Sequence, residues 1–373
     1  MASREYRGGL LRGSSEAPAH IRKETLSKPA RKTGLWLLTT VVTVAVMLIL
    51  GEILIGLASP SEYLYPRYQF SAEYGLIPFP NVVMVHGIPR KYEFHYTVNS
   101  MNSRGEVVVP HRSGLPAVVV LGDSYSFGMG VPDGDEYPTI MRHRLSGRAD
   151  VVNLGEPGWG LTQEIRRYYD TGAKYKPEIV VLQFCANDPS DNLANRVTVV
   201  ENGEFKFIDS ANSLNIVKKY LSRSFVQRTQ LYNFMRTRAS QVLLTRLTKH
   251  EASRLDASAP DTSKTGAVPG IERVHIELLE TFAAKLHAEG RRLWVISVDH
   301  QLEQFPHIDK AVRDLDARGE LRYIEVLDWL KGHEPYASPE GHMWGTPAHE
   351  LIGEHLAAEV SAALADSSAA PKS

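Results

Sequence analysis

Ala117-Val118-Val119-Val120-Leu121-Gly122-Asp123-Ser124 is the stretch of the sequence that decides the fold. Its first five residues have small or branched apolar side chains, a pattern typical of a buried parallel strand. A glycine directly after the strand allows a sharp turn, and α/β sheets carry their reactive groups at the carboxyl ends of their strands. Ser124 is therefore a candidate for chemistry, although Gly, Asp and Ser are also frequent in ordinary turns.

Strands and helices alternate from residue 116 onward. Apolar runs predict strands, and amphipathic runs predict helices. The expected strands are 117–121, 151–154, 179–184, 293–298 and 323–327, and the expected helices are 136–145, 163–173 and 349–364. This alternation predicts a three-layer α/β/α sandwich with a mainly parallel, flavodoxin-like sheet, which we place at residues 116–366.

An insertion separates the third and fourth expected strands, at about residues 189–270. Residues 197–207 predict a hairpin around Asn202-Gly203. Residues 214–247 predict a basic helix, and the Ser-, Ala- and Pro-rich residues 251–270 predict a linker. The basic side chains of the helix either form a solvated face, which is the commoner arrangement, or bind a membrane or an anionic substrate.

The composition excludes several classes of protein. The chain has 373 residues, is 43% hydrophobic and carries a formal net charge of -1, which is ordinary for a globular protein. No basic patch is interleaved with aromatic residues, so we expect no nucleic-acid partner. Cys185 is the single cysteine, which excludes an intrachain disulfide. Four ligands at metal-like spacing are absent from the sequence, and we expect neither a metal nor a cofactor.

A long apolar segment precedes the α/β region. Residues 34–51 carry no charge, and the apolar run resumes after Glu52. Because about 20 apolar residues span a bilayer core, we expect one transmembrane helix at 34–58. Glu52 would then lie near the far interface, where a carboxylate reaches water at modest cost.

The basic residues before this segment predict its orientation. Residues 1–33 hold eight lysines and arginines. The positive-inside rule therefore places this tail in the cytoplasm and residues from 60 onward on the periplasmic or extracytoplasmic side. The alternatives are a buried core helix and a cleaved signal peptide, but the apolar run is long for a signal peptide and no clean cleavage site precedes Ser59. Residues 60–115 contain short alternating stretches and predict a membrane-proximal β-rich segment.

Further candidate residues follow the second and third strands and precede the last helix. Gly158 belongs to a glycine-rich stretch after the second strand, where backbone N–H groups can approach a ligand closely. Asn187 follows the third strand, and its side chain can donate hydrogen bonds to an oxyanion. His342 precedes the last helix and is a candidate general base for a serine, with Glu340 two residues before it to orient the imidazole.

The order serine, glycine, asparagine and histidine resembles the SGNH (GDSL) hydrolase family, in particular its membrane-anchored bacterial members. The resemblance covers roughly residues 116–364 without the insertion. It implies that Ser124 is the nucleophile and His342 the base. It also implies that the backbone N–H of Ser124, the backbone N–H of Gly158 and the side chain of Asn187 form the oxyanion hole.

The sequence departs from the family pattern near its histidine. The family usually has Asp three residues before the histidine, where this chain has Pro339. Glu340 stands in the position that some relatives use instead. Asp299 is the fallback for the acid, and His349 is the fallback for the base.

The resemblance implies a serine esterase that acts on O-acyl or O-acetyl groups through an acyl-Ser124 intermediate. With the expected anchor, its substrate would be a small-molecule, glycan or lipid ester of the cell envelope. Two alternatives remain open at this point. One is an O-acetyltransferase of an exported polysaccharide, and the other is a catalytically impaired domain that binds a glycan or a partner.

Overall fold

The computed structural model describes residues 28–111, 113–210, 224–257 and 268–369. The chain divides into two compact units, Met1–Gly51 and Glu52–Ser373. Helix α1 (Lys28–Ala58) includes the stretch Lys32–Ala58, which is long and apolar enough to cross a membrane, with a mean hydropathy of 2.6. None of that stretch is buried, so α1 is not a core helix.

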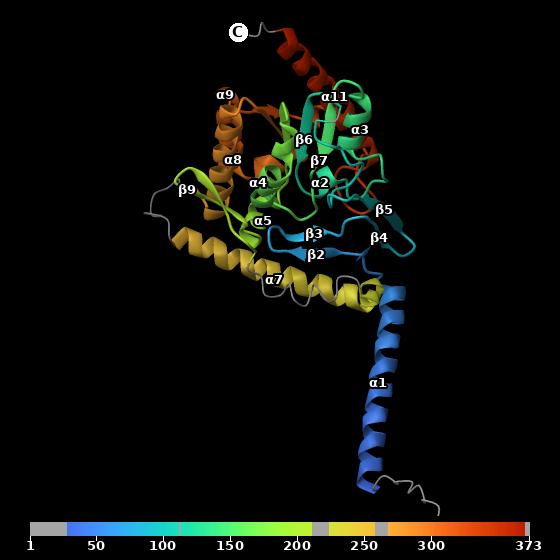
Figure 1. Ribbon diagram of the computed structural model, residues 1–373. Helices are drawn as coiled ribbons and strands as arrows, with labels where there is room; N and C mark the ends of the chain where they lie inside the picture. Colours follow the sequence, from blue (N-terminus) through green and yellow to red (C-terminus); the bar gives the residue numbers. More distant parts are fainter. Residues whose placement is uncertain (1–27, 112, 211–223, 258–267, 370–373) are drawn as a thin grey trace, which may run out of the picture. The chain divides into compact units, whose positions relative to one another are not determined.

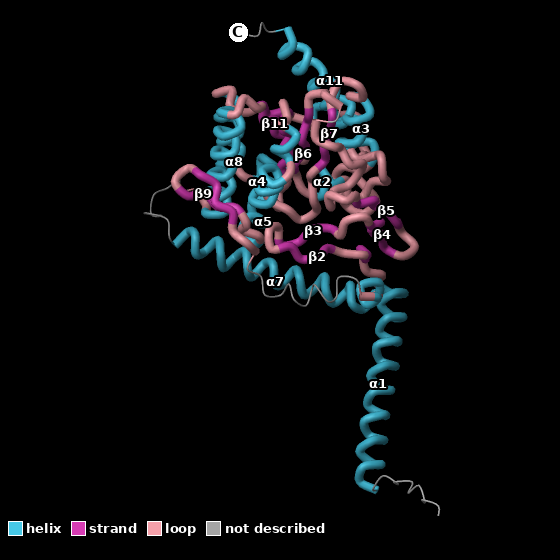
Figure 2. Tube along the Cα trace, viewed as in Figure 1, coloured by secondary structure: helices cyan, strands magenta, loops and turns pink. Residues whose placement is uncertain are grey.

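The larger unit is built around a sheet of parallel strands (Figures 1 and 2). Across the sheet, the strands are β12 (Arg322–Ile324), β11 (Arg292–Ser297), β8 (Ile179–Phe184), β6 (Ala117–Leu121) and β7 (Asp150–Asn153). Of the strands in this sheet, β6 comes first in the sequence. It lies between the second, β7, and the third, β8. This is the flavodoxin-like order, whose topological switch point lies at the carboxyl ends of β6 and β8.

Helices cover both faces of this sheet. One face carries α3 (Tyr137–Arg144) and α11 (Thr346–Ala369), and the other carries α4 (Leu161–Asp170), α8 (Gly270–Ala288) and α9 (Pro306–Ala317). Alternate residues of β6 enter the two cores: Val118 and Val120 pack with α3 and α11, whereas Val119 and Leu121 pack with the other three helices. The predicted three-layer α/β/α sandwich is confirmed.

The residues between α1 and β6 form antiparallel strands. These are β1 (Tyr63–Tyr65), β2 (Tyr68–Ser71), β3 (Gly75–Pro78), β4 (Val82–Ile88) and β5 (Tyr92–Val98). Strands β1, β4 and β5 make one sheet, and β2 pairs with β3. Met84 and Tyr96 of this sheet pack against Phe127 and Met129, which closely follow β6. The β-rich segment is thus part of the same compact unit as the parallel sheet.

The remaining elements are short, apart from one long helix. They are α2 (Ser124–Phe127), η1 (Gly172–Tyr175), α5 (Asp188–Ala194), β9 (Thr198–Glu201), β10 (Glu204–Phe207), η2 (Phe225–Arg228), α7 (Gln230–Ala257), η3 (Asp299–Gln304) and α10 (Leu327–Leu330). Strands β9 and β10 form the predicted hairpin, and both Asn202 and Gly203 have the positive φ angles of its tight turn.

The boundaries of three predicted elements are wrong. The strand expected at 323–327 ends at Ile324, because Val326 and Leu330 turn into the core at helical spacing. The expected helix at 214–247 overlaps α7, which begins only at Gln230, and its residues 214–223 lie outside the described residues.

The linker expected at 251–270 is largely replaced by helix in its described parts. Helix α7 continues to Ala257, because Ala252 and Leu255 pack against the core, and α8 begins at Gly270. Residues 258–267 of this stretch lie outside the described residues.

The start of α7 is fixed by a carboxylate from the end of α1. Glu52 accepts hydrogen bonds from the backbone N–H groups of Gln230 and Leu231, at 2.7 and 2.8 Å. The side chain of Gln230 in turn accepts a hydrogen bond from the backbone of Ser61. A carboxylate satisfies the free N–H groups of a helix start and is stabilised by the helix dipole.

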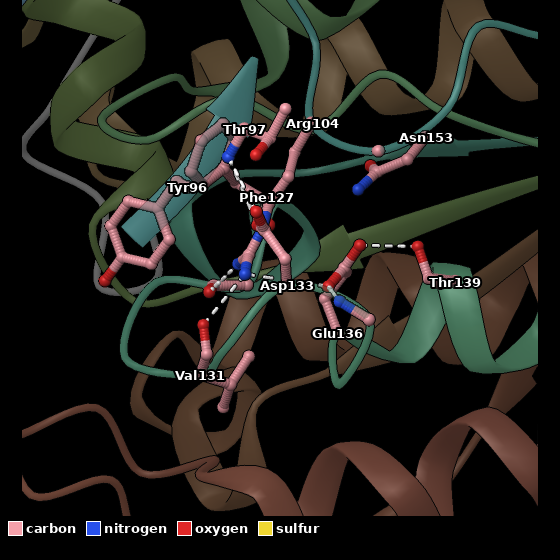
Figure 3. A network of polar contacts seen from close by, with 12 residues as sticks. Tyr96, Thr97, Arg104, Phe127, Val131, Asp133, Glu136, Thr139 and Asn153 are labelled. Atoms are coloured by element: carbon pink, nitrogen blue, oxygen red, sulfur yellow. Dashed lines mark hydrogen bonds and ion pairs between the residues drawn. The ribbon is translucent and has the colours of Figure 1, made fainter. Parts of the chain in front are cut away.

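Arg104, which follows β5, ties the β-rich segment to the loop after α2 (Figure 3). Its buried guanidinium donates to the carbonyl oxygens of Gly128 and Val131, the latter at 2.8 Å. Its Nε donates to Asp133 at 3.0 Å, and the guanidinium carbon lies 4.7 Å from the ring centroid of Tyr96. One side chain thereby fixes the loop that follows the candidate serine.

Arg104→Lys is expected to lower the free energy of unfolding by about 2–4 kcal/mol. A lysine ammonium cannot reach two carbonyl groups and a carboxylate at once, so buried acceptors would lose their partners. Denaturant unfolding of the full chain in detergent measures the change. The control is Arg144→Lys, which alters an exposed ion pair with Glu354 and should cost less than about 1 kcal/mol. Equal losses for the two variants would contradict the assigned role.

Candidate active site

Ser124 lies at the first residue of α2, immediately after the turn that ends β6. Gly122 in this turn has φ +149°, and a Cβ there would overlap Ser126 Oγ and the side chain of Gln183. Gln183 belongs to the neighbouring strand β8, and its Oε1 accepts the backbone N–H groups of Asp123 and Ser126. The turn is therefore fastened to the next strand, which sets the position of Ser124.

His342 and Glu340 form a hydrogen-bonded row with Ser124. His342 Nε2 lies 2.8 Å from Ser124 Oγ. The other ring nitrogen, Nδ1, is hydrogen-bonded to the carboxylate of Glu340. The side chain of Glu340 is 4% exposed, against 21% for His342, so the carboxylate is the more buried of the two. Hydroxyl, imidazole and carboxylate thus follow one another in the order required of a nucleophile, a base and an orienting acid.

The loop that carries Glu340 and His342 packs directly on the backbone after α2. Ser338 Oγ donates to the carbonyl of Gly130 at 2.7 Å. Gly130 has φ +79°, and a Cβ there would overlap both Ser338 Oγ and the Glu340 carboxylate. The rings of Tyr125 and His342 make a T-shaped contact, with 4.8 Å between the centroids. Glycine at position 130 is what allows Glu340 to reach His342.

The pKa of His342 is shifted by opposing effects. Burial lowers the pKa, but the hydrogen bond and the charge of Glu340 outweigh it, so that the net pKa lies above the usual value for histidine. The carboxylates of Asp123 and Glu62 act in the same direction as Glu340. An imidazole with a raised pKa accepts a proton from a serine more readily.

The two fallback residues make other contacts. His349 is fully buried, its Nδ1 accepts the backbone N–H of Tyr137 at 3.1 Å, and burial lowers its pKa to about 3. The carboxylate of Asp299 accepts hydrogen bonds from Trp344 Nε1 at 2.8 Å and Tyr336 Oη at 3.2 Å. Asp299 therefore fixes the loop around His342, whereas Glu340 contacts the imidazole of His342.

The candidate oxyanion residues follow β7 and β8. Gly158 is exposed, with φ +75° and open space where a Cβ would lie. Asn187 is the residue before α5, and its Nδ2 donates to the carboxylate of Asp191 at 2.7 Å. Since all strands of the sheet are parallel, Ser124, Gly158 and Asn187 lie along one edge of it.

Sequence reasoning missed the residues that hold these groups in place. Gln183 is a polar residue near the end of an otherwise apolar strand, which was a usable signal for its role. Gln301 accepts the backbone N–H of Ala186 at 2.7 Å, next to Asn187, and Asp191 orients Asn187 itself. No local pattern marked these last two residues.

Several carboxyl groups are buried close to the site. Burial raises the pKa of Asp123, Glu164 and Asp188, and it raises the pKa of Asp191 to about 7. The negative charges of neighbouring carboxylates push the pKa values of Glu164 and Asp188 further upward. Such clusters of perturbed groups are frequent at functional sites.

A sequence profile identifies the family. The profile of the GDSL-like lipase/acylhydrolase family matches residues 120–341, more than half of the 373 residues. The chain belongs to this family. The GDSL hydrolase accordingly acts on ester bonds. The matched span contains Ser124, Gly158, Asn187 and Glu340 and ends one residue before His342.

Several solved structures are similar to this chain. A putative lipolytic protein of the G-D-S-L family from Desulfitobacterium hafniense is 10% identical, with a TM-score of 0.38 over 65% of this chain and 98% of that one. A lipase/acylhydrolase from Enterococcus faecalis is 13% identical, with a TM-score of 0.37 over 67% and 97%. A carbohydrate acetylesterase family member from Sinorhizobium meliloti is 11% identical, with a TM-score of 0.34 over 67% and 100%. No curated protein matches this chain.

Glu340→Gln is expected to lower the pKa of His342, because the amide removes the charge that outweighs burial. Histidine resonances followed by NMR across a pH titration measure this, with His342→Gln to assign the signal. The matched control is Glu303→Gln, which removes the exposed carboxylate beside His300 and should shift only that histidine. An unchanged titration of His342 in Glu340→Gln would show that another group sets its pKa.

Proposed function

We propose that this protein is a membrane-anchored serine esterase that cleaves O-acyl groups of an envelope substrate through an acyl-Ser124 intermediate. The observation that carries the proposal is the hydrogen-bonded row of Ser124, His342 and Glu340. An intact row of this kind favours an active enzyme over an impaired domain that only binds a glycan or a partner.

In the first step, Ser124 Oγ forms a bond to the ester carbonyl carbon while His342 Nε2 takes the hydroxyl proton. The carbonyl oxygen becomes an oxyanion, which the backbone N–H groups of Ser124 and Gly158 and the amide of Asn187 stabilise. The C–O bond to the alcohol then breaks, and His342 gives its proton to the leaving oxygen. Glu340 keeps the imidazole oriented and stabilises its charged form throughout.

In the second step, water replaces the serine hydroxyl as the nucleophile. His342 takes a proton from the water as its oxygen bonds to the acyl carbon. The bond to Ser124 Oγ breaks, Oγ regains its proton from His342, and a carboxylic acid leaves. The same residues therefore serve both halves of the reaction.

The location of the enzyme forms part of the proposal. Residues 34–58 would cross the membrane, residues 1–33 would remain in the cytoplasm, and residues from 60 onward would face the periplasm. The apolar, unburied stretch Lys32–Ala58 supports this arrangement. The active site would then meet esters at the membrane surface or in the envelope.

Ser124→Ala is expected to abolish hydrolysis of an aryl acetate and labelling by a fluorophosphonate probe, because both reactions need the Ser124 oxygen. Both are measured on the full chain in detergent. Ser146→Ala removes an exposed hydroxyl from the turn after α3 and should leave both reactions intact. Hydrolysis at equal rates by wild type and Ser124→Ala would refute the proposal.

Asn187→Ala is expected to lower kcat by about 10²–10³-fold with little change in KM, since an oxyanion donor acts mainly in the transition state. Steady-state kinetics on the same aryl acetate measure both constants. Ser190→Ala serves as the control, because Ser190 lies in α5 and its hydroxyl donates to the backbone carbonyl of Asn187, not to the side chain that binds the oxyanion. A loss confined to KM would assign Asn187 to substrate binding instead.

A further inference from the structure

A second carboxylate–imidazole pair lies beside Glu340. His86, in β4, is 1% exposed, and its Nε2 is hydrogen-bonded to the carboxylate of Glu62, which precedes β1. One ligand-type atom from each of Glu62, His86 and Glu340 lies within 4.8 Å of the other two. The three residues come from distant parts of the sequence, so the β-rich segment reaches the candidate active site.

Both ring nitrogens of His86 are hydrogen-bonded, Nδ1 to Tyr96 and Nε2 to Glu62. The backbone N–H of Gly130 donates to Tyr96 Oη at 2.9 Å, so the phenol proton is free to donate to His86 Nδ1, 2.8 Å away. In the tautomer whose Nδ1 accepts that proton, Nε2 carries the ring proton and donates it to Glu62. A nitrogen that carries a proton cannot ligate a metal, so this geometry favours a hydrogen-bonded chain over a metal site.

The charges around the cluster keep Glu62 ionised. Burial raises the pKa of Glu62, but His86 and the positive charges of Arg67 and Arg236 bring it below its usual value. Other titratable groups also face the cluster. They are Tyr68 in β2, Tyr92 and Tyr96 in β5, Asp123 before α2, and His342.

We propose that Glu62 and His86 are positioning residues that hold the Glu340 carboxylate on His342. Two nearby carboxylates repel, so the charge of Glu62 disfavours movement of the Glu340 carboxylate from the imidazole toward Glu62. The same charge favours the protonated form of His342, which exists only while the reaction is under way. The proposal rests on the esterase function proposed above, and it makes the β-rich segment a part of the catalytic apparatus.

Glu62→Gln is the direct test, because it removes the charge and keeps the shape. We expect kcat on an aryl acetate to fall about fivefold with KM unchanged, and the acidic limb of the pH profile to move to lower pH. The side chain of Glu62 is 47% exposed, so the variant should fold, which a thermal melt of the full chain checks. Unchanged kcat and an unchanged acidic limb would overturn the inference.

The matched control is Glu93→Gln. Glu93 and His95 form an exposed carboxylate–imidazole pair on the neighbouring strand, with 3.0 Å between Oε1 and Nε2. Glu93 also accepts the hydroxyl of Tyr63 at 2.7 Å, but it is not a member of the cluster of Glu62, His86 and Glu340, so its loss should leave kcat and the pH profile as in wild type. Equal effects of Glu62→Gln and Glu93→Gln would indicate a general loss of negative charge and overturn the inference.

A double-mutant cycle tests whether Glu62 acts through Glu340. In a Glu340→Gln background, Glu62→Gln should lower kcat less than it does in wild type, because the carboxylate that it positions is gone and only its direct charge effect on His342 remains. If the losses in kcat of the two single variants simply multiply in the double variant, the positioning role is overturned. It is also overturned if the wild-type chain binds one zinc ion and the Glu62→Gln variant binds none. The esterase proposal stands or falls separately, on Ser124→Ala.

Discussion

The close approach of three chain segments at Gly130 is the constraint on which the site depends. The N–H of Gly130 donates to the hydroxyl of Tyr96 from the β-rich segment, and its carbonyl accepts a hydrogen bond from Ser338. A Cβ at position 130 would overlap the carboxylate of Glu340. Arg104 holds the backbone on either side of it through Gly128 and Val131. A residue without a side chain is therefore the point where the β-rich segment, the serine turn and the histidine loop meet.

The sequence predicts those parts of the site that depend on local patterns. The residues Ser124, Gly158 and Asn187 each follow an apolar strand, and the topology of a parallel sheet gathers strand ends at one edge. The spacing of Glu340 and His342 is also local, and their hydrogen bond follows from it. These features need no knowledge of how distant segments pack.

Residues that act through distant contacts escaped sequence reasoning. Glu62 and His86 are 24 positions apart and meet Glu340 only after the β-rich segment has packed on the sheet. The strand predicted at 323–327 was given the wrong end for a related reason. An apolar run such as Val326-Leu327 fits a strand or a helical turn equally well. Tertiary packing decides such cases, and no local periodicity reports it.

The burial of carboxyl groups beneath the site costs the folded state free energy when these groups are charged. Glu164 and Asp188 have raised pKa values because burial disfavours their charged forms. A group with a raised pKa stabilises the fold fully below its unfolded-state pKa, and that contribution is lost as the pH rises through the folded-state value. The site is therefore assembled on acids that favour their neutral form, a common compromise between stability and function.

The bond between Glu52 and the start of α7 has a mechanical consequence. In a chain anchored as proposed, Glu52 would lie at the outer boundary of the membrane, where its carboxylate accepts hydrogen bonds from the N–H groups of Gln230 and Leu231. A vertical shift of α1, as in a thinner or thicker bilayer, would pull directly on the first turn of α7. Bilayer thickness would then act as a load on the hydrolase domain, transmitted through the Glu52 carboxylate and through the bond between Arg90 and the carbonyl of Gly56.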